Sequence, residues 1–362
     1  MDINDQTKNV NGIQKLLYTV CLTPLGLFGI LVLAVLPLVP PFNQDYLIRW
    51  MVAGLIMAAQ CVAFDFTGGY INIVNFGFAA FVGLGAYASA IISVKLGISP
   101  WIGMFVGILP AALVGFLTGI LTLRLRGIYA AVMVFFLSLA LMGLTTKWVS
   151  LTEGPLGLNC PTLLKASSNL PYFYIIFTMF VVTYIVLKWV VRSNMGLAFK
   201  AIGQNMEAAR TSGINPTRYR IINFTLSCAF AGWIGGFYAH YYGILMPEVM
   251  SASKTIEVLV VVYIGGRASL WGGAFAAIPF VFAMEMVRSV FSQYPGLNLI
   301  FYGLFLILIM IYYPGGAAQL YQSLIERLKN PFFLRLVKGA VPAHQKKEIQ
   351  VSDLSLAEKL KR

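Results

Sequence analysis

The chain is dominated by apolar runs of about 20 residues, the length of helix that crosses the hydrocarbon core of a bilayer. Hydrophobic residues make up 59% of the sequence and charged residues 11%, against about 25% charged residues in a typical soluble domain. A soluble globular enzyme is therefore excluded. The pattern predicts an all-α, polytopic transmembrane helical bundle of about ten spans, some of them broken or half-spanning. The candidate spans are 16–39, 47–66, 71–94, 101–123, 128–148, 171–191, 221–242, 255–264, 272–290 and 299–313.

The distribution of basic residues predicts the orientation. The net charge of +13 would suggest nucleic acid as a partner of a soluble protein. Here Lys and Arg lie mostly between apolar runs and in the tail, so positive-inside topology is the better interpretation. We expect a cytoplasmic N-terminal segment, 1–15, a transmembrane domain, 16–320, with a cytoplasmic segment at 192–220, and a basic cytoplasmic tail, 321–362. Both termini are predicted to be cytoplasmic, and no nucleic acid partner is expected.

The run at 255–264 is too short to cross a bilayer alone. It is either a half-span that ends at Gly265-Gly266 or a helix that continues through these glycines.

Motifs for covalent chemistry are missing from the sequence. It contains no GxxxxGK[ST], HExxH or GxSxG pattern, its two histidines do not cluster with acids, and its four cysteines form no CxxC pair. We therefore expect no catalytic residues, no cofactor and no metal site. His240, near the end of an apolar run, is predicted to be an interfacial polar residue.

The segment 194–219 is amphipathic. Four apolar residues recur at spacings of three and four and so share one helix face: Phe199, Ile202, Met206 and Ala209. A stiff helix with such a stripe can dock in the groove of another protein, or it can lie on the lipid interface.

The same segment contains a stop and a restart. Gly213 can take the left-handed conformation that ends a helix. Asn215-Pro216 offers an N-cap followed by proline at the first helical position. The spacing predicts a short helix, a sharp turn and a new helix that returns to the membrane.

Several motifs in colinear order, from about residue 50 to 315, resemble the branched-chain amino acid permease family of ABC importers, and more closely its M-type subunit. The segment Glu207-Ala208-Ala209 with Gly213 resembles the EAA…G coupling loop of such permeases. The other matching motifs are Thr67-Gly68-Gly69-Tyr70, Gly83-Leu84-Gly85-Ala86-Tyr87, Leu123-Arg124-Leu125-Arg126-Gly127-Ile128-Tyr129, Ala201-Ile202, Ala231-Gly232, Gly235-Gly236 and Ile264-Gly265-Gly266-Arg267-Ala268-Ser269-Leu270-Trp271-Gly272.

The resemblance implies a multi-pass subunit in the bacterial cytoplasmic (inner) membrane that moves branched-chain or related amino acids inward. Its partners would be a homologous second permease subunit, two ATP-binding subunits and a periplasmic substrate-binding protein that contacts outer loops such as 149–170. The ATPase-coupling residues would be Phe199, Ile202, Met206, Glu207, Ala208, Ala209 and Gly213.

The sequence departs from the family pattern at Asn75-Phe76-Gly77-Phe78, where an S-x-G-H pattern is usual, and at Glu153, where a glycine is usual. The tail from residue 326 also looks longer than usual, and its basic residues could bind membrane lipid. These differences leave the small-molecule substrate open.

A polar pathway needs irregular backbone at membrane depth, which is tolerated where it lines a cavity or is buried in protein. Asn72 and Asn75 would supply neutral hydrogen bonds there, and the glycines would break helices or only allow close packing. The predicted pathway residues are Gly68, Gly69, Asn72, Asn75, Gly77, Glu257, Gly265, Gly266 and Arg267.

Several charges lie in or near the apolar runs. Asp65 is expected to have a role at a helix end, and Arg267 either clamps helix ends or gates. Glu257 can pair with Lys254 or lie at the mouth of the pathway. Glu285 and Arg288, at i and i+3, can neutralise each other.

Three alternatives remain. The same ABC class includes permeases for urea, short amides or sugars. An ion-driven secondary transporter would need intramembrane acids, for which Glu257 and Glu285 are available. A structural or assembly subunit of a membrane complex would have neither a transport role nor contact with a binding protein.

Overall fold

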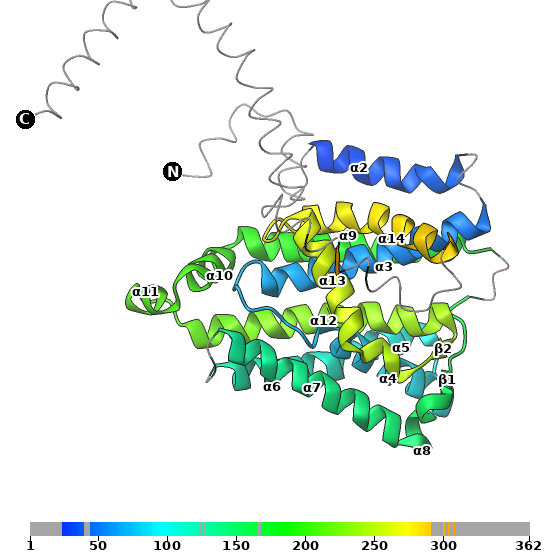
Figure 1. Ribbon diagram of the computed structural model, residues 1–362, viewed down its shortest axis with the longest axis horizontal. Helices are drawn as coiled ribbons and strands as arrows, with labels where there is room; N and C mark the ends of the chain where they lie inside the picture. Colours follow the sequence, from blue (N-terminus) through cyan, green and yellow to red (C-terminus); the bar gives the residue numbers. More distant parts are fainter. Residues whose placement is uncertain are drawn as a thin grey trace, which may run out of the picture. The chain divides into compact units, whose positions relative to one another are not determined.

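Long helices account for most of the described part of the chain. The structure is a computed structural model that describes residues 24–39, 44–123, 125, 127–164, 168–290, 300, 303, 304 and 307. All of these belong to one compact unit, Met1–Gly316; the second unit, Ala317–Arg362, lies outside the described residues. The elements are α2 (Pro24–Val35), η1 (Leu36–Leu38), α3 (Asp45–Gly68), α4 (Phe78–Lys95), α5 (Pro100–Val106), α6 (Ile108–Thr122), α7 (Ile128–Lys147), α8 (Val149–Thr152), η2 (Gly154–Leu156), β1 (Leu158–Asn159), α9 (Leu170–Arg192), α10 (Asn194–Gln204), α11 (Met206–Thr211), α12 (Pro216–Tyr242), β2 (Ile244–Leu245), η3 (Pro247–Met250), α13 (Ala252–Gly265) and α14 (Trp271–Val290) (Figure 1).

Six helices in the described part are long and apolar enough to cross a membrane. They are α3, α4, the continuous stretch Pro100–Thr122 formed by α5 and α6, α7, α9 and α12. This confirms the prediction of an all-α membrane protein. The count of about ten spans and the cytoplasmic termini stay predictions, because residues 1–23 and most of 291–362 lie outside the described residues.

Helix α12 packs against α4 through glycines that allow backbone contact. A methyl group at Gly235 would overlap the carbonyl oxygen of Val82, and one at Gly85 would overlap the backbone of Gly232. Small residues let helices approach this closely in membranes, where van der Waals contact drives association. The glycines of α12 therefore hold it directly against α4.

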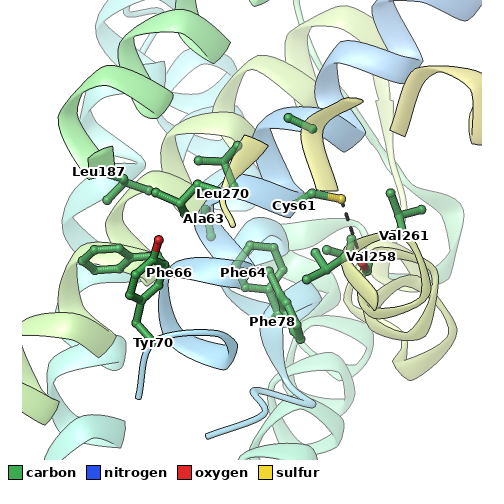
Figure 2. Close-up of a cluster of buried hydrophobic side chains, with 14 of the residues drawn as sticks. Cys61, Ala63, Phe64, Phe66, Tyr70, Phe78, Leu187, Val258, Val261 and Leu270 are labelled. Carbon is green, nitrogen blue, oxygen red and sulfur yellow. Dashed lines mark hydrogen bonds between the residues drawn. The ribbon is translucent and has the colours of Figure 1, made fainter. Parts of the chain in front are cut away.

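An apolar cluster connects α3 to its neighbours (Figure 2). The rings of Phe64 and Phe78 meet edge to face at 5.5 Å, which joins α3 to the first residue of α4. The thiol of Cys61 donates to the carbonyl oxygen of Val258 in α13 at 3.9 Å. Leu187 of α9 lies in the same cluster. Helix α3 is thus in contact with α4, α9 and α13.

Two predicted spans are interrupted. The predicted helix at 71–94 begins only at Phe78, because Asn72 has a positive φ of 63° and Asn75 accepts the N–H of Gly77 at 3.1 Å just before α4. The predicted helix at 101–123 is divided at Gly107 into α5 and α6. Pro110 lacks the N–H that would bond the carbonyl of Val106, so the backbone ladder is broken there.

The predicted half-span at 255–264 is confirmed in its shorter form. Helix α13 has 14 residues and ends at Gly265, and Gly266 follows with φ 101°.

A short antiparallel pair, β1 and β2, closes one end of the helices, with Leu158 opposite Leu245. His240, at the end of α12, is fully buried beside this pair. Its Nδ1 lies 2.7 Å from the carbonyl oxygen of Pro161, and its Nε2 lies 2.9 Å from the hydroxyl of Ser89. The prediction of an interfacial His240 was therefore wrong: its two ring nitrogens fasten the β1 loop to α4 and α12.

Candidate functional site

The cytoplasmic segment predicted at 192–220 is built from two short helices, α10 and α11, at the opposite end of the bundle from β1 and β2 (Figure 1). The single predicted helix is divided at Asn205, whose side chain accepts the N–H groups of Glu207 at 3.0 Å and Ala208 at 3.1 Å. An N-cap of this kind starts a new helix.

The turn after α11 matches the prediction. Gly213 has a φ of 82°, and Asn215 caps α12 by accepting the N–H of Arg218 at 3.3 Å, with Pro216 at the first helical position. The segment is therefore held in a defined conformation by its own side chains.

The apolar stripe of this segment faces inward. Phe199, Ile202 and Ala209 are buried and Met206 is half-buried, and the Phe199 ring meets Phe66 of α3 edge to face at 5.6 Å. The expectation that this stripe enters another protein's groove needs correction, because the protein's own core covers it. The segment instead presents residues of the opposite face.

The exposed face of α11 is polar and small. Glu207, Ala208 and Arg210 are exposed, and the Glu207 and Arg210 side chains lie 3.9 Å apart. Exposed pairs of this kind add little stability. Folding stability alone therefore does not explain these residues.

The Gly68-Gly69 end of α3 meets the chain that follows α13. The buried carboxylate of Asp65 accepts the N–H groups of Ala268 and Leu270, each at 2.8 Å. A methyl group at Gly69 would overlap the N–H of Ala268 or the Asp65 carboxylate. Asp65 thus has the expected role at a helix end, and Gly69 allows the close approach.

Asn72 and Arg267 are brought together across this junction. The Arg267 guanidinium donates to Asn72 Oδ1 at 2.9 Å, and Asn72 Nδ2 lies 3.5 Å from the carbonyl oxygen of Gly203 in α10. Gly265 is packed on the backbone of Gly272. The structure therefore gathers most of the predicted pathway residues beside α10, where they clamp helix ends.

Asn75 and Gly77 form the second part of the predicted pathway set. Asn75 is fully buried, and a methyl group at Gly77 would overlap the carbonyl oxygen of Val134. Among the described residues, Asn75 Nδ2 has no hydrogen-bond partner. Helix packing, the alternative reading of these glycines, accounts for Gly69, Gly77 and Gly265.

A cavity of about 150 Å³ lies between α3, α4, α12, α13 and α14. Its charged groups are Lys254, Glu257 and Glu285. The ammonium of Lys254 lies 3.0 Å from both carboxylate oxygens of Glu257, whose side chain is only 10% exposed. The remaining lining residues are Ala53, Ile56, Met57, Gln60, Ala79, Val82, Tyr238, Tyr242, Val249, Val258, Phe280, Val281 and Met284.

Of the predicted pathway residues, only Glu257 lines this cavity. Glu257 and Gly265 lie eight residues apart on α13, which is about 12 Å along a helix. The predicted set is therefore divided between the cavity and the junction beside α10.

Comparison with known proteins decides the family. Residues 46–310 match the model of the family described as branched-chain amino acid transport system / permease component. The chain belongs to this family. It is a multi-pass inner-membrane permease of the ABC transporter class.

The relatives carry two kinds of name. The high-affinity branched-chain amino acid permease LivM of Escherichia coli is 28% identical over 290 residues, which cover 72% of this chain and 67% of LivM. LivM of Salmonella typhimurium is 28% identical over 276 residues, covering 68% of this chain and 64% of that protein. The nucleoside permease NupC of Lactococcus lactis is 26% identical over 215 residues, covering 52% and 67%. The permease thus spans about two thirds of the length of these relatives. No solved structure matches it.

Sequence reasoning missed the polar groups Gln60, Tyr238 and Tyr242 of the cavity. Gln60 is a lone amide in the middle of an apolar run, and that interruption was the available signal. The predicted pair of Glu285 with Arg288 falls partly outside the described residues, because the Arg288 side chain is not described. Glu285 itself lines the cavity of the permease.

Proposed function

We propose that this permease is the membrane-spanning subunit of an importer that moves branched-chain or related amino acids inward. A homologous second permease subunit would complete the pathway, and two ATP-binding subunits would supply the energy in trans. A periplasmic binding protein would deliver the substrate. The chain itself would make and break no covalent bond.

The Lys254–Glu257 pair in the cavity carries this proposal. An amino acid has an ammonium and a carboxylate that need partners of opposite charge away from water. Lys254 would bind the carboxylate and Glu257 the ammonium, with each charge exchanging its present partner for the substrate. The aliphatic side chains of Ile56, Val82 and Val281 line the same cavity and suit a branched apolar substrate. Its volume of about 150 Å³ suits a ligand smaller than a drug-sized molecule.

A nucleoside or sugar permease is the second candidate. Tyr238 and Tyr242 beside the cavity favour it, since aromatic rings with hydroxyls suit bases and sugars. Such neutral substrates give no partner to a shielded ion pair, so Lys254 and Glu257 would have no task. The ion pair therefore favours the zwitterion.

The open side of the cavity supports a second membrane subunit. Charged groups within a membrane bundle face protein or water rather than lipid. Lys254 is 45% exposed at the cavity, so another protein surface would have to cover it. A homologous permease subunit fits that requirement.

Replacing Glu257 with Gln is expected to lower leucine uptake about tenfold or more, the effect of losing roughly 1.4 kcal/mol of binding. The amide keeps the shape of the side chain but cannot neutralise an ammonium. Uptake of radiolabelled leucine into proteoliposomes measures the change. The exposed Glu248, changed to Gln, is the matched control and should transport normally. Equal uptake by the two variants would remove Glu257 from the pathway.

The exposed face of α11 supports docking of the ATP-binding subunits. Glu207, Ala208 and Arg210 would contact the partner. Phe199, Ile202, Met206, Ala209 and Gly213 would hold that face in position from behind, which keeps their coupling role but changes how they exert it.

Replacing Glu207 with Lys is expected to weaken docking by about tenfold or more, since a like charge opposed across an interface costs several kcal/mol at most. Membrane insertion should be unchanged, because Glu207 is exposed. Co-purification of the ATP-binding subunits in mild detergent measures docking. The Glu207→Gln variant, which removes the charge without reversing it, should lose less. Normal docking and transport by Glu207→Lys would refute the coupling assignment.

A further inference from the structure

The loop between α3 and α4, residues 69–77, lies between the coupling segment and the junction after α13. On one side, Gly203 of α10 fits against the carbonyl of Tyr70, and the Lys200 ammonium lies 5.9 Å from the centre of the Tyr70 ring. On the other side, Arg267 donates to Asn72. A displacement of α10 would therefore act on this loop first.

Asn72 is the residue of the loop that contacts both sides. Its Oδ1 accepts from Arg267 at 2.9 Å, and its Nδ2 points to Gly203 at 3.5 Å, so the shorter contact is the one to Arg267. Its backbone φ of 63° is uncommon for a residue other than glycine, although asparagine tolerates it better than most. Because Asn72 is exposed, these bonds contribute little to folding. Their geometry calls for another explanation.

Helix α13 is held at both ends by elements that meet this loop. At its start, the hydroxyl of Thr255 accepts the N–H of Ala79, one residue into α4 and just after the loop. At its end, Gly266 leads directly into Arg267. Between these two attachments lie Lys254 and Glu257, close to the first attachment and on the cavity. A shift of Asn72 would therefore move α13 through Arg267.

We propose that Asn72 is a positioning residue that couples α10 to α13, through its bond to Arg267. Movement of the coupling segment would shift Asn72, and Arg267 would transmit the shift to α13 and the charged pair in the cavity. This inference rests on the proposed function, because it needs α10 and α11 to be the segment that the ATP-binding subunits move.

The test uses the complete complex with two substitutions that both tolerate a positive φ. Asn72→Gly removes the side chain, whereas Asn72→Asp keeps the acceptor for Arg267. We expect Asn72→Gly to assemble and hydrolyse ATP normally but to transport at least about fivefold less leucine per ATP. Asn72→Asp should transport close to the wild-type ratio, which a merely structural role for the side chain would not predict. A wild-type ratio in Asn72→Gly would overturn the proposal.

A second readout is independent of the substrate. A single cysteine at Ala53, on the cavity, is introduced into a chain whose four native cysteines are replaced. A non-hydrolysable ATP analogue should change its rate of thiol labelling severalfold in the wild-type loop and in Asn72→Asp, and the change should be lost in Asn72→Gly. A change that persists in Asn72→Gly, or none in the wild-type loop, would overturn the coupling. If labelling behaves as expected while leucine is not transported, only the proposed substrate fails.

Discussion

Replacing Gly235 with Ala is expected to destabilise the permease by about 3 kcal/mol or more, the upper range for overpacking a tight interior. The added methyl group would overlap the carbonyl oxygen of Val82 and lie 3.1 Å from the N–H of Ala86. Both obstacles are backbone atoms of α4, so no rotamer change can relieve the overlap. Helix α4 cannot move aside easily, because Gly85 and Gly232 hold the same interface. Thermal unfolding of the purified chain in detergent measures the loss.

Gly143→Ala is the matched control for this prediction. Gly143 lies in α7, is exposed and has open space around the added methyl group. Alanine is favoured over glycine in a helix by up to about 1 kcal/mol, so this variant should be as stable as the wild type or slightly more so. Equal stability of the two variants would show that α4 and α12 do not pack as described.

Replacing Asp65 with Ala is expected to cost about 3 kcal/mol or more, since each buried hydrogen bond to a charged group contributes roughly 1.5–3 kcal/mol. The N–H groups of Ala268 and Leu270 would lose their acceptor. Both residues have a positive φ, 63° and 57°, which is a strained conformation that needs support. The loop should relax, and thermal unfolding in detergent should shift to lower temperature.

Asp45→Ala controls for the loss of an aspartate from the same helix. Asp45 is exposed in the first turn of α3, where its favourable interaction with the helix dipole is about 0.5 kcal/mol. Asp65→Asn, which keeps one acceptor oxygen, should fall between the two. If Asp65→Ala unfolds at the same temperature as Asp45→Ala, the carboxylate does not hold the loop.

The helices of the bundle could largely be predicted from the sequence, because each is an apolar run bounded by polar or glycine residues. The half-span α13 was predictable from its length alone, and the turn at Gly213 from its residue types. The start of α4 was not, because residues 71–76 are mostly apolar and read as helix. Only the side chain of Asn75 and the backbone of Asn72 show the interruption.

The candidate site was predictable only in part. Periodicity identified the stripe of Phe199 and Ile202 on one helix face, but periodicity cannot tell whether a stripe meets a partner or the protein's own core. Glu257 stood out because a charge in an apolar run is unusual. Its neighbours in the cavity come from α3, α12 and α14, and no local pattern brings residues so far apart in the sequence together.

The central claim is that the permease moves a branched zwitterion through a membrane pathway lined by Lys254 and Glu257. ATP-dependent uptake of radiolabelled leucine into proteoliposomes that contain the complete complex tests it most directly. We expect leucine to accumulate, with unlabelled valine and isoleucine competing and a nucleoside or fructose having no effect. Failure of leucine to accumulate, or its displacement by the nucleoside or the sugar, would contradict the account.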